Sequence, residues 1–211
     1  MQTLGRRERN KAEKRDRIVS AASRLFAQHG FAATTTQQVA ADADVADGTL
    51  FRYAPTKVEL LLMVTNERLA PLLDAGRQAA EARRPAEVVA AILDLVGPLA
   101  ALADAEPDTV GPYLREVMFG TAGPHRTEAL TLVDDLVHTI ADLLRPHVAV
   151  GDLPPGLDLP EAARWVFSTL SSEVLRSVVG RGAPDTAASL EAHIRVLLRG
   201  LGVRLEGGQR P

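Results

Sequence analysis

Apolar residues recur at helical spacing along most of the chain. The first such segment spans residues 15–29 and is followed by Gly30, where a C-terminal cap is expected. Its apolar face consists of Ile18, Ala21, Ala22, Leu25 and Phe26. Gly and Pro residues separate the later segments, which is typical of helix boundaries. The pattern predicts further helices over residues 86–103, 108–119, 126–148, 160–179 and 186–201.

Two short helices are predicted between the first helix and the later ones. Thr35 and Gln38 form a Thr-x-x-Gln capping box, and the helix that they open ends near Ala43. After a tight turn, Asp47 can cap a second short helix that ends near Tyr53. Two short helices joined by a tight turn are the pattern of a helix-turn-helix motif.

A long helix follows, opened by the capping box of Thr56 and Glu59 and crossed by Pro71, which can kink it. We therefore predict an all-α protein of about nine helices. Residues 1–60 are expected to form a three-helix DNA-binding domain with a basic N-terminal arm. Residues 61–211 are expected to form a second helical domain.

Composition agrees with this fold class and narrows the chemistry. Apolar residues make up 46% of the chain and aromatic residues only 4%, which favours packed helices over sheets. The absence of Cys excludes disulfides and thiolate metal sites. The most apolar segment, residues 85–103, is interrupted by polar and helix-breaking residues, so we expect a soluble, cytoplasmic protein without a membrane partner.

Charge is distributed unevenly along the chain. Residues 1–60 carry ten Lys and Arg against seven Asp and Glu, whereas the remainder carries 14 against 20. Seven basic residues gather near the N-terminus: Arg6, Arg7, Arg9, Lys11, Lys14, Arg15 and Arg17. A run of this kind is attracted to nucleic-acid phosphates, although a solvated tail would have the same composition.

The first third of the chain resembles a known family. Residues 15–41 (RDRIVSAASRLFAQHGFAATTTQQVAA) and 48–61 (GTLFRYAPTKVELL) are similar to the DNA-binding domain of TetR/AcrR regulators. The resemblance implies a transcriptional regulator that binds double-stranded DNA. The residues that it places at the DNA are Thr36, Gln37, Asp47, Gly48, Thr49, Phe51, Arg52, Tyr53 and Lys57.

The resemblance also implies different roles for these residues. Thr36 and Gln37 stand where the family contacts phosphates, and residues 47–49 with Arg52 stand on the recognition helix. Phe51, Tyr53 and Lys57 occupy positions that clamp phosphates. Alternatives stay open for two of them, because Asp47 could serve only as a helix cap and Phe51 could serve only in packing. Val39 and Leu50 are expected in the core.

Four positions depart from the family pattern. Asp44 replaces a turn glycine, Ala46 a capping Ser or Thr, Asp47 a basic or neutral residue, and Ala54 a larger apolar residue. Together with Asp42, two of these residues place negative charge near the expected DNA face, which weakens nonspecific affinity. The alternative function is therefore a helical ligand-binding dimer whose DNA binding is weakened or lost.

Beyond the first third, the resemblance implies that residues 61–211 form a helical domain for effector binding and dimerisation. It implies a ligand-responsive repressor that binds a palindromic operator as a homodimer and is released by a small-molecule effector of unknown identity. The last two predicted helices carry apolar stripes suited to burial within the subunit and across a dimer. Candidate ligand contacts, chosen by residue type, are Tyr113, Met118, Phe119, His138 and Trp165.

Motifs for catalysis are missing from the sequence. It has no phosphate-binding loop, no dinucleotide fingerprint and no pair of His at metal-ligand spacing, and its five His are scattered. We therefore predict no enzymatic activity, no cofactor and no metal site.

Overall fold

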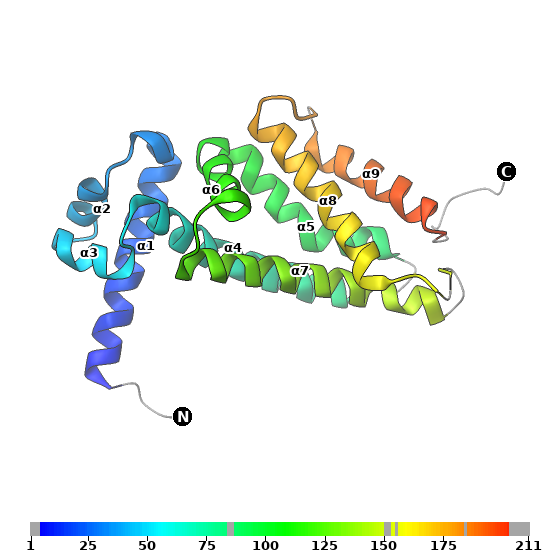
Figure 1. The fold of residues 1–211 in the computed structure, drawn as a ribbon, viewed down its shortest axis with the longest axis horizontal. Helices are drawn as coiled ribbons and strands as arrows, with labels where there is room; N and C mark the ends of the chain where they lie inside the picture. Colours follow the sequence, from blue (N-terminus) through cyan, green and yellow to red (C-terminus); the bar gives the residue numbers. More distant parts are fainter. Residues whose placement is uncertain (1–4, 84–86, 150–152, 155, 184, 203–211) are drawn as a thin grey trace. The chain divides into compact units, whose positions relative to one another are not determined.

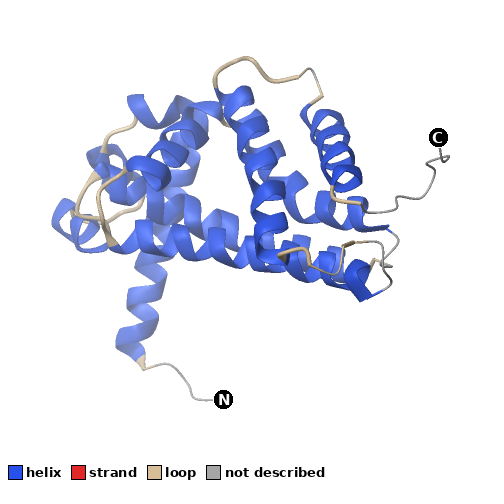
Figure 2. Cartoon of the chain, turned by 45° about the vertical axis from the view of Figure 1, so that its right-hand side comes forward, coloured by secondary structure: helices blue, strands red, loops and turns tan. Residues whose placement is uncertain are grey.

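A computed structural model describes residues 5–83, 87–149, 153–154, 156–183 and 185–202. Within these ranges the chain forms nine helices and no strand, which confirms the predicted all-α class (Figures 1 and 2). The helices are α1 (Arg6–Ala33), α2 (Thr36–Asp42), α3 (Asp47–Tyr53), α4 (Lys57–Glu81), α5 (Val88–Ala105), α6 (Pro107–Phe119), α7 (Pro124–Ala149), α8 (Leu159–Val178) and α9 (Thr186–Gly200).

Helix α1 is longer than predicted. It begins at Arg6, so most of the expected basic arm is helical. Residues 6–14 lack an apolar repeat, but they are rich in Arg, Lys and Glu, which are good helix formers. At its other end, Gly30 adopts φ 76° and ψ 162°, which breaks the regular helix before one further turn. The predicted helix end at Gly30 thus coincides with this break.

The two short helices form where the capping pattern predicts them. The Thr35 hydroxyl accepts a hydrogen bond from the Gln38 N–H at 3.1 Å, and the Gln38 side chain accepts one from the Thr35 N–H at 2.8 Å. The backbone N–H groups of Thr35 and Gln38 thereby have hydrogen-bond acceptors. Val39 and Leu50 are fully buried with Ile18 of α1, so their predicted place in the core is confirmed.

The chain divides into two compact units. The first comprises residues 1–68 and 108–130, and the second comprises residues 69–107 and 131–211. The sequence-based boundary at residue 60 differs from this division because α6 and the start of α7 belong with the helix-turn-helix. Thr109 of α6, for example, is buried and donates a hydrogen bond to the Phe26 carbonyl at 3.4 Å.

The second unit is built around α5, α8 and α9, which pack against one another. Helix α5 is long and apolar enough to cross a membrane by length and composition. It serves here as a core helix, with Ile92, Leu95 and Val96 almost fully buried. Near its end, Asp104 accepts hydrogen bonds from the Ser177 and Thr186 hydroxyls, which link α5 to the segments around α8 and α9.

Helices α4 and α5 approach closely at Gly76. A Cβ at this position would lie 2.8 Å from the Asp94 carbonyl oxygen and 3.0 Å from the Leu95 Cα. We expect Gly76→Ala to lower the free energy of unfolding by about 1–3 kcal/mol, the usual cost of overpacking. Denaturant unfolding measures this loss.

Gly97 provides the matched control because it also lies within a helix, but a Cβ there would meet no atom within 4 Å. Gly97→Ala should stabilise α5 by about 0.5–1 kcal/mol, because alanine loses less conformational freedom on folding. Equal changes in the free energy of unfolding for the two variants would contradict the close approach at Gly76.

Candidate DNA-binding site

The turn between α2 and α3 is held in an unusual backbone conformation. Asp44 adopts φ 50°, in the left-handed region where glycine is favoured. The turn is closed by hydrogen bonds from the Asp44 N–H to the Ala41 carbonyl (3.2 Å) and from the Val45 N–H to the Ala40 carbonyl (3.0 Å). An aspartate can therefore occupy the position at which the family has glycine, at some cost in strain.

Two arginines of α1 pair with acidic residues near this turn. Arg17 Nη1 lies 3.1 Å from Asp44 Oδ2, and Arg24 pairs with Asp42. These pairs are exposed and contribute little to stability. Their effect on the local charge is more important than their effect on stability, because each guanidinium offsets a carboxylate that would otherwise repel phosphate.

The recognition helix α3 presents an open surface. Asp47, Gly48 and Arg52 are exposed, and Phe51 is 44% exposed. Thr49 is half-buried, while the buried Leu50 anchors the helix to the core.

The start of α3 corrects one expectation. Its N-cap residue is Ala46, with no side-chain cap, so Asp47 is the first helical residue and not the cap. A carboxylate in the first turn still interacts favourably with the helix dipole. Ala54, at the end of α3, is fully buried, so this departure from the family pattern leaves the residue in the core.

The first turn of α2 carries the other two predicted DNA contacts. Thr36 is half-buried and Gln37 is exposed. Both follow the N-cap residue Thr35, so they lie at the positive end of the helix dipole.

Tyr53 and Lys57 each bond to α1. The Tyr53 hydroxyl donates to the Lys11 carbonyl at 3.0 Å. Lys57 Nζ donates to the Ala32 carbonyl at 3.0 Å and lies 4.5 Å from the centre of the Phe31 ring. Sequence reasoning missed these contacts, since their carbonyl acceptors lie 42 and 25 residues away.

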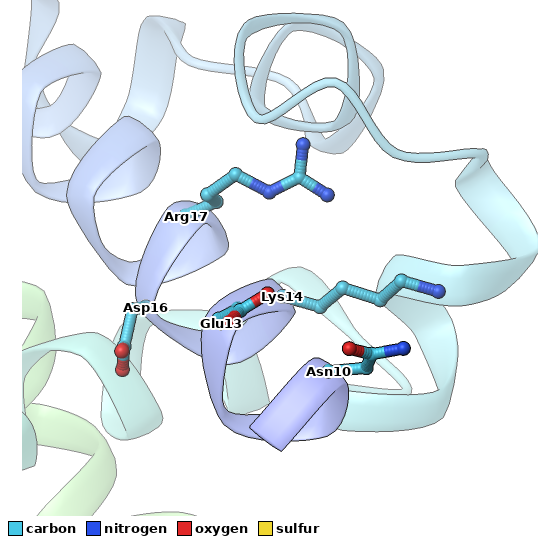
Figure 3. A pocket seen from close by; sticks show the side chains of 5 residues that line it. All are labelled: Asn10, Glu13, Lys14, Asp16 and Arg17. Carbon is cyan, nitrogen blue, oxygen red and sulfur yellow. The ribbon is translucent and has the colours of Figure 1, made fainter. Parts of the chain in front are cut away.

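A surface hollow of about 580 Å³ lies along the N-terminal half of α1 (Figure 3). It is lined by Asn10, Glu13, Lys14, Asp16 and Arg17. Arg17 extends toward the helix-turn-helix, where it pairs with Asp44. A hollow lined by polar and charged side chains does not suit an apolar effector.

The five candidate ligand contacts are divided between the units. Tyr113, Met118 and Phe119 belong to the first unit, and His138 and Trp165 belong to the second. Met118, Phe119 and Trp165 are 61%, 83% and 57% exposed. The exposed His138 ring bonds to the Asp134 carbonyl of its own helix at 2.7 Å.

Tyr113 is a member of a buried polar network. Its hydroxyl donates to Asn66 Oδ1 at 2.9 Å, and the Asn66 amide donates to the His125 carbonyl at 2.8 Å. Burial raises the pKa of Tyr113, which keeps its hydroxyl neutral. Asn66 and His125 were not among the predicted functional residues, because an isolated Asn or His within a helix carries no sequence signal.

The capped helix α2 and the exposed seven-residue helix α3 are joined by a tight turn and packed against the longer helix α1. This arrangement is that of a helix-turn-helix DNA-binding protein. Comparison with known proteins specifies the class. The sequence model of the family described as "Bacterial regulatory proteins, tetR family" matches residues 18–64.

Three relatives match most of the chain. The HTH-type transcriptional repressor KstR of Rhodococcus jostii is 30% identical over 200 residues, covering 94% of this chain and 86% of the repressor. The structure of Thermus thermophilus FadR, a TetR-family repressor in complex with lauroyl-CoA, is 31% identical with a TM-score of 0.70, covering 93% of this chain and all of that one. KstR of Mycobacterium tuberculosis is 27% identical, covering 88% of this chain and 81% of that repressor.

The chain therefore belongs to the TetR family. It is a ligand-responsive DNA-binding repressor and not an enzyme, as the sequence predicted.

The left-handed turn can be tested at Asp44. Asp44→Gly and Asp44→Ala both remove the ion pair with Arg17, but only glycine relieves the positive φ. We expect the glycine variant to be about 1 kcal/mol more stable than the alanine variant in denaturant unfolding. An alanine variant as stable as the glycine variant would show that the turn is not left-handed in solution.

Proposed function

We propose that α3 enters the major groove of an operator while the first turn of α2 contacts the phosphate backbone. The observation that carries this proposal is the open face of α3, above all Gly48. A Cβ at Gly48 would meet no atom of the chain within 4 Å, so internal packing does not require a glycine there. Glycine weakens a helix by about 1 kcal/mol relative to alanine. Close approach of the backbone to DNA provides a reason for it.

The neighbouring side chains match the groups that DNA offers. The Thr49 methyl group suits a thymine methyl, and Arg52 can bind phosphate or a guanine edge. The exposed Asp47 carboxylate can accept a hydrogen bond from a cytosine amine. The half-buried Thr36, the exposed Gln37 and the partly exposed Phe51 would contact the backbone on either side.

Lys57 and Tyr53 differ in what they can offer to phosphate. A lysine ammonium has three donors, and the hydrogen bond to Ala32 uses one of them, so Lys57 retains donors for phosphate. The Tyr53 hydroxyl has one donor, which is engaged with Lys11. Tyr53 would contact phosphate only after exchanging that bond, and it first serves to hold α1 against α3.

The regulator would act as a homodimer, with a second copy of the chain covering α8 and α9. Four large apolar side chains are exposed there: Trp165, Leu175, Val179 and Val196. Trp165 and Leu175 lie on α8 and Val179 is its C-cap residue. Spacings of ten and four residues place the three on one helix face. Twofold symmetry matches a palindromic operator with half-sites about 34–36 Å apart. A chromosomal operator in a bacterium would place the protein in the cytoplasm.

We infer that the effector is an acyl-CoA thioester bound in the second unit. Full-length similarity to a regulator solved with lauroyl-CoA supports this ligand class. Helix α5 has a mean hydropathy of 1.9, yet only 44% of its residues are buried. The remaining apolar surface could contact an acyl chain. Binding of the acyl-CoA would favour a distance between the helix-turn-helix motifs of the two subunits that does not fit successive major grooves. The dimer would then leave the operator, and repression would end.

Selection of duplexes from a random DNA pool tests the DNA-binding proposal. A palindrome should be enriched, and Thr49→Ala should alter the base preference within each half-site. If Arg52 binds phosphate, Arg52→Ala should instead weaken binding to all sequences and reduce the salt dependence by about one phosphate contact. Failure to enrich any sequence at low salt would favour the ligand-binding alternative.

The effector class is tested on the selected duplex by fluorescence anisotropy. Lauroyl-CoA should lower operator affinity by about 5- to 150-fold, the usual range of allosteric coupling. Free CoA and lauric acid are the matched controls, since each lacks one half of the thioester. Equal affinity with and without lauroyl-CoA would contradict the proposed effector class, although it would leave DNA binding intact.

A further inference from the structure

His125 connects the end of the recognition helix to α7. The residue lies in the first turn of α7 and is only 8% exposed. Its Nε2 is 3.0 Å from the carbonyl oxygen of Tyr53, the last residue of α3. Its Nδ1 is 2.8 Å from Oε2 of Glu128, one turn further along α7. We call this arrangement, formed by His125, Glu128 and the Tyr53 carbonyl, the His125 bracket.

Both partners of the ring are hydrogen-bond acceptors. A neutral imidazole has one N–H donor and can satisfy only one of them, whereas an imidazolium donates from both nitrogens. Both acceptors also favour positive charge: Glu128 is an exposed carboxylate, and the Tyr53 carbonyl lies at the negative end of the α3 dipole. The geometry therefore fits the charged ring.

The backbone of His125 is fixed independently of its ring. The Glu59 carboxylate of α4 accepts a hydrogen bond from the His125 N–H at 3.4 Å. The Asn66 amide, also of α4, donates to the His125 carbonyl at 2.8 Å. Among the described residues, the ionisable groups that these hydrogen bonds connect to His125 are Glu128 of α7, Glu59 of α4 and, through Asn66, Tyr113 of α6. Loss of the ring proton would change the bond to α3 without releasing the start of α7.

We propose that His125 in its charged form positions the recognition helix for DNA. This inference rests on the proposed role of α3 in the operator complex. Deprotonation leaves the ring with one N–H donor. The Glu128 carboxylate is a stronger acceptor than the Tyr53 carbonyl, so the remaining proton stays on Nδ1 and α3 loses its hydrogen bond to α7. Operator affinity therefore falls when a rise in pH removes the second proton of the ring.

The test compares wild type with His125→Gln on the duplex recovered by selection. Anisotropy is measured from about pH 5.5 to about pH 8.5 at constant ionic strength. Wild-type affinity should fall by about tenfold over this range, the effect expected for one charged hydrogen bond. The His125→Gln variant should show a flat profile, because an amide can donate to Tyr53 at every pH. A variant that is uniformly weaker but keeps the wild-type slope would overturn the proposal.

Two histidines provide matched controls. His29 is exposed on α1 and could attract phosphate when charged, and His138 is exposed on α7. His29→Gln and His138→Gln should both retain the wild-type pH profile. If His29→Gln alone flattened the profile, general electrostatic attraction would replace the His125 bracket as the cause.

A second variant keeps the proposal testable if His125→Gln does not fold. The Glu128 side chain is 51% exposed, so Glu128→Gln should be tolerated. It keeps an acceptor for Nδ1 but removes the negative charge, so the pH dependence of operator affinity should change. An unchanged profile would overturn the proposal.

A DNA-free measurement separates this inference from the proposed function. The full chain is labelled with ¹⁵N-histidine, and the ring nitrogens are followed by NMR. At about pH 5.5 both nitrogens of His125 should carry protons. A neutral ring at that pH would overturn the His125 bracket, even if the protein binds its operator. Failure to bind any duplex, with a doubly protonated ring, would instead contradict the proposed function.

Discussion

A seven-residue helix has almost no stability in isolation, so the position of α3 depends on the groups that hold it. Leu50 supplies the apolar anchor and is fully buried. Polar contacts then fix the ends. The Tyr53 hydroxyl ties the last turn to α1, and the Tyr53 carbonyl faces His125 of α7. One residue of the recognition helix thus contacts two long helices through different atoms.

Helix α1 also provides arginines that pair with the acidic residues near the α2–α3 turn. Its basic residues are suited to attract phosphate, but Arg17 and Arg24 form ion pairs with Asp44 and Asp42. The acidic residues near the turn are therefore partly offset by the chain itself, and the helix-turn-helix keeps an exposed face that can approach phosphate. Asp47 differs, because it takes part in no ion pair among the residues that the structure describes. Its carboxylate is the acidic group of α3 that is left for contact with DNA.

The sequence predicted the elements whose signals are local. The capping box of Thr35 and Gln38 set the start of α2, and Gly30 marked the break in α1. Helical residues 6–14 were missed because they lack apolar periodicity. The capping box expected at Thr56 forms in part: the Glu59 N–H bonds to the Thr56 hydroxyl, while the Glu59 carboxylate bonds to the His125 N–H.

Contacts between distant segments could not be predicted from these signals. Residues 108–130 join the first unit, although residues 69–107 separate them from it in sequence. Tyr113 was chosen as a ligand contact by residue type, but its hydroxyl bonds to Asn66 in a buried network. A single histidine at position 125 gave no pattern to detect. Its importance arises from the two acceptors that the fold places on either side of its ring.

Two helices would transmit the effect of a ligand bound in the second unit to the first unit. Helices α4 and α7 each begin in the first unit and continue into the second. A coupling free energy of about 1–3 kcal/mol is enough for regulation. One charged hydrogen bond is worth a similar amount. A ligand that shifted the second-unit part of α7 would therefore not need to unfold the helix-turn-helix; weakening the hydrogen bond between His125 and Tyr53 would change operator affinity by a comparable factor.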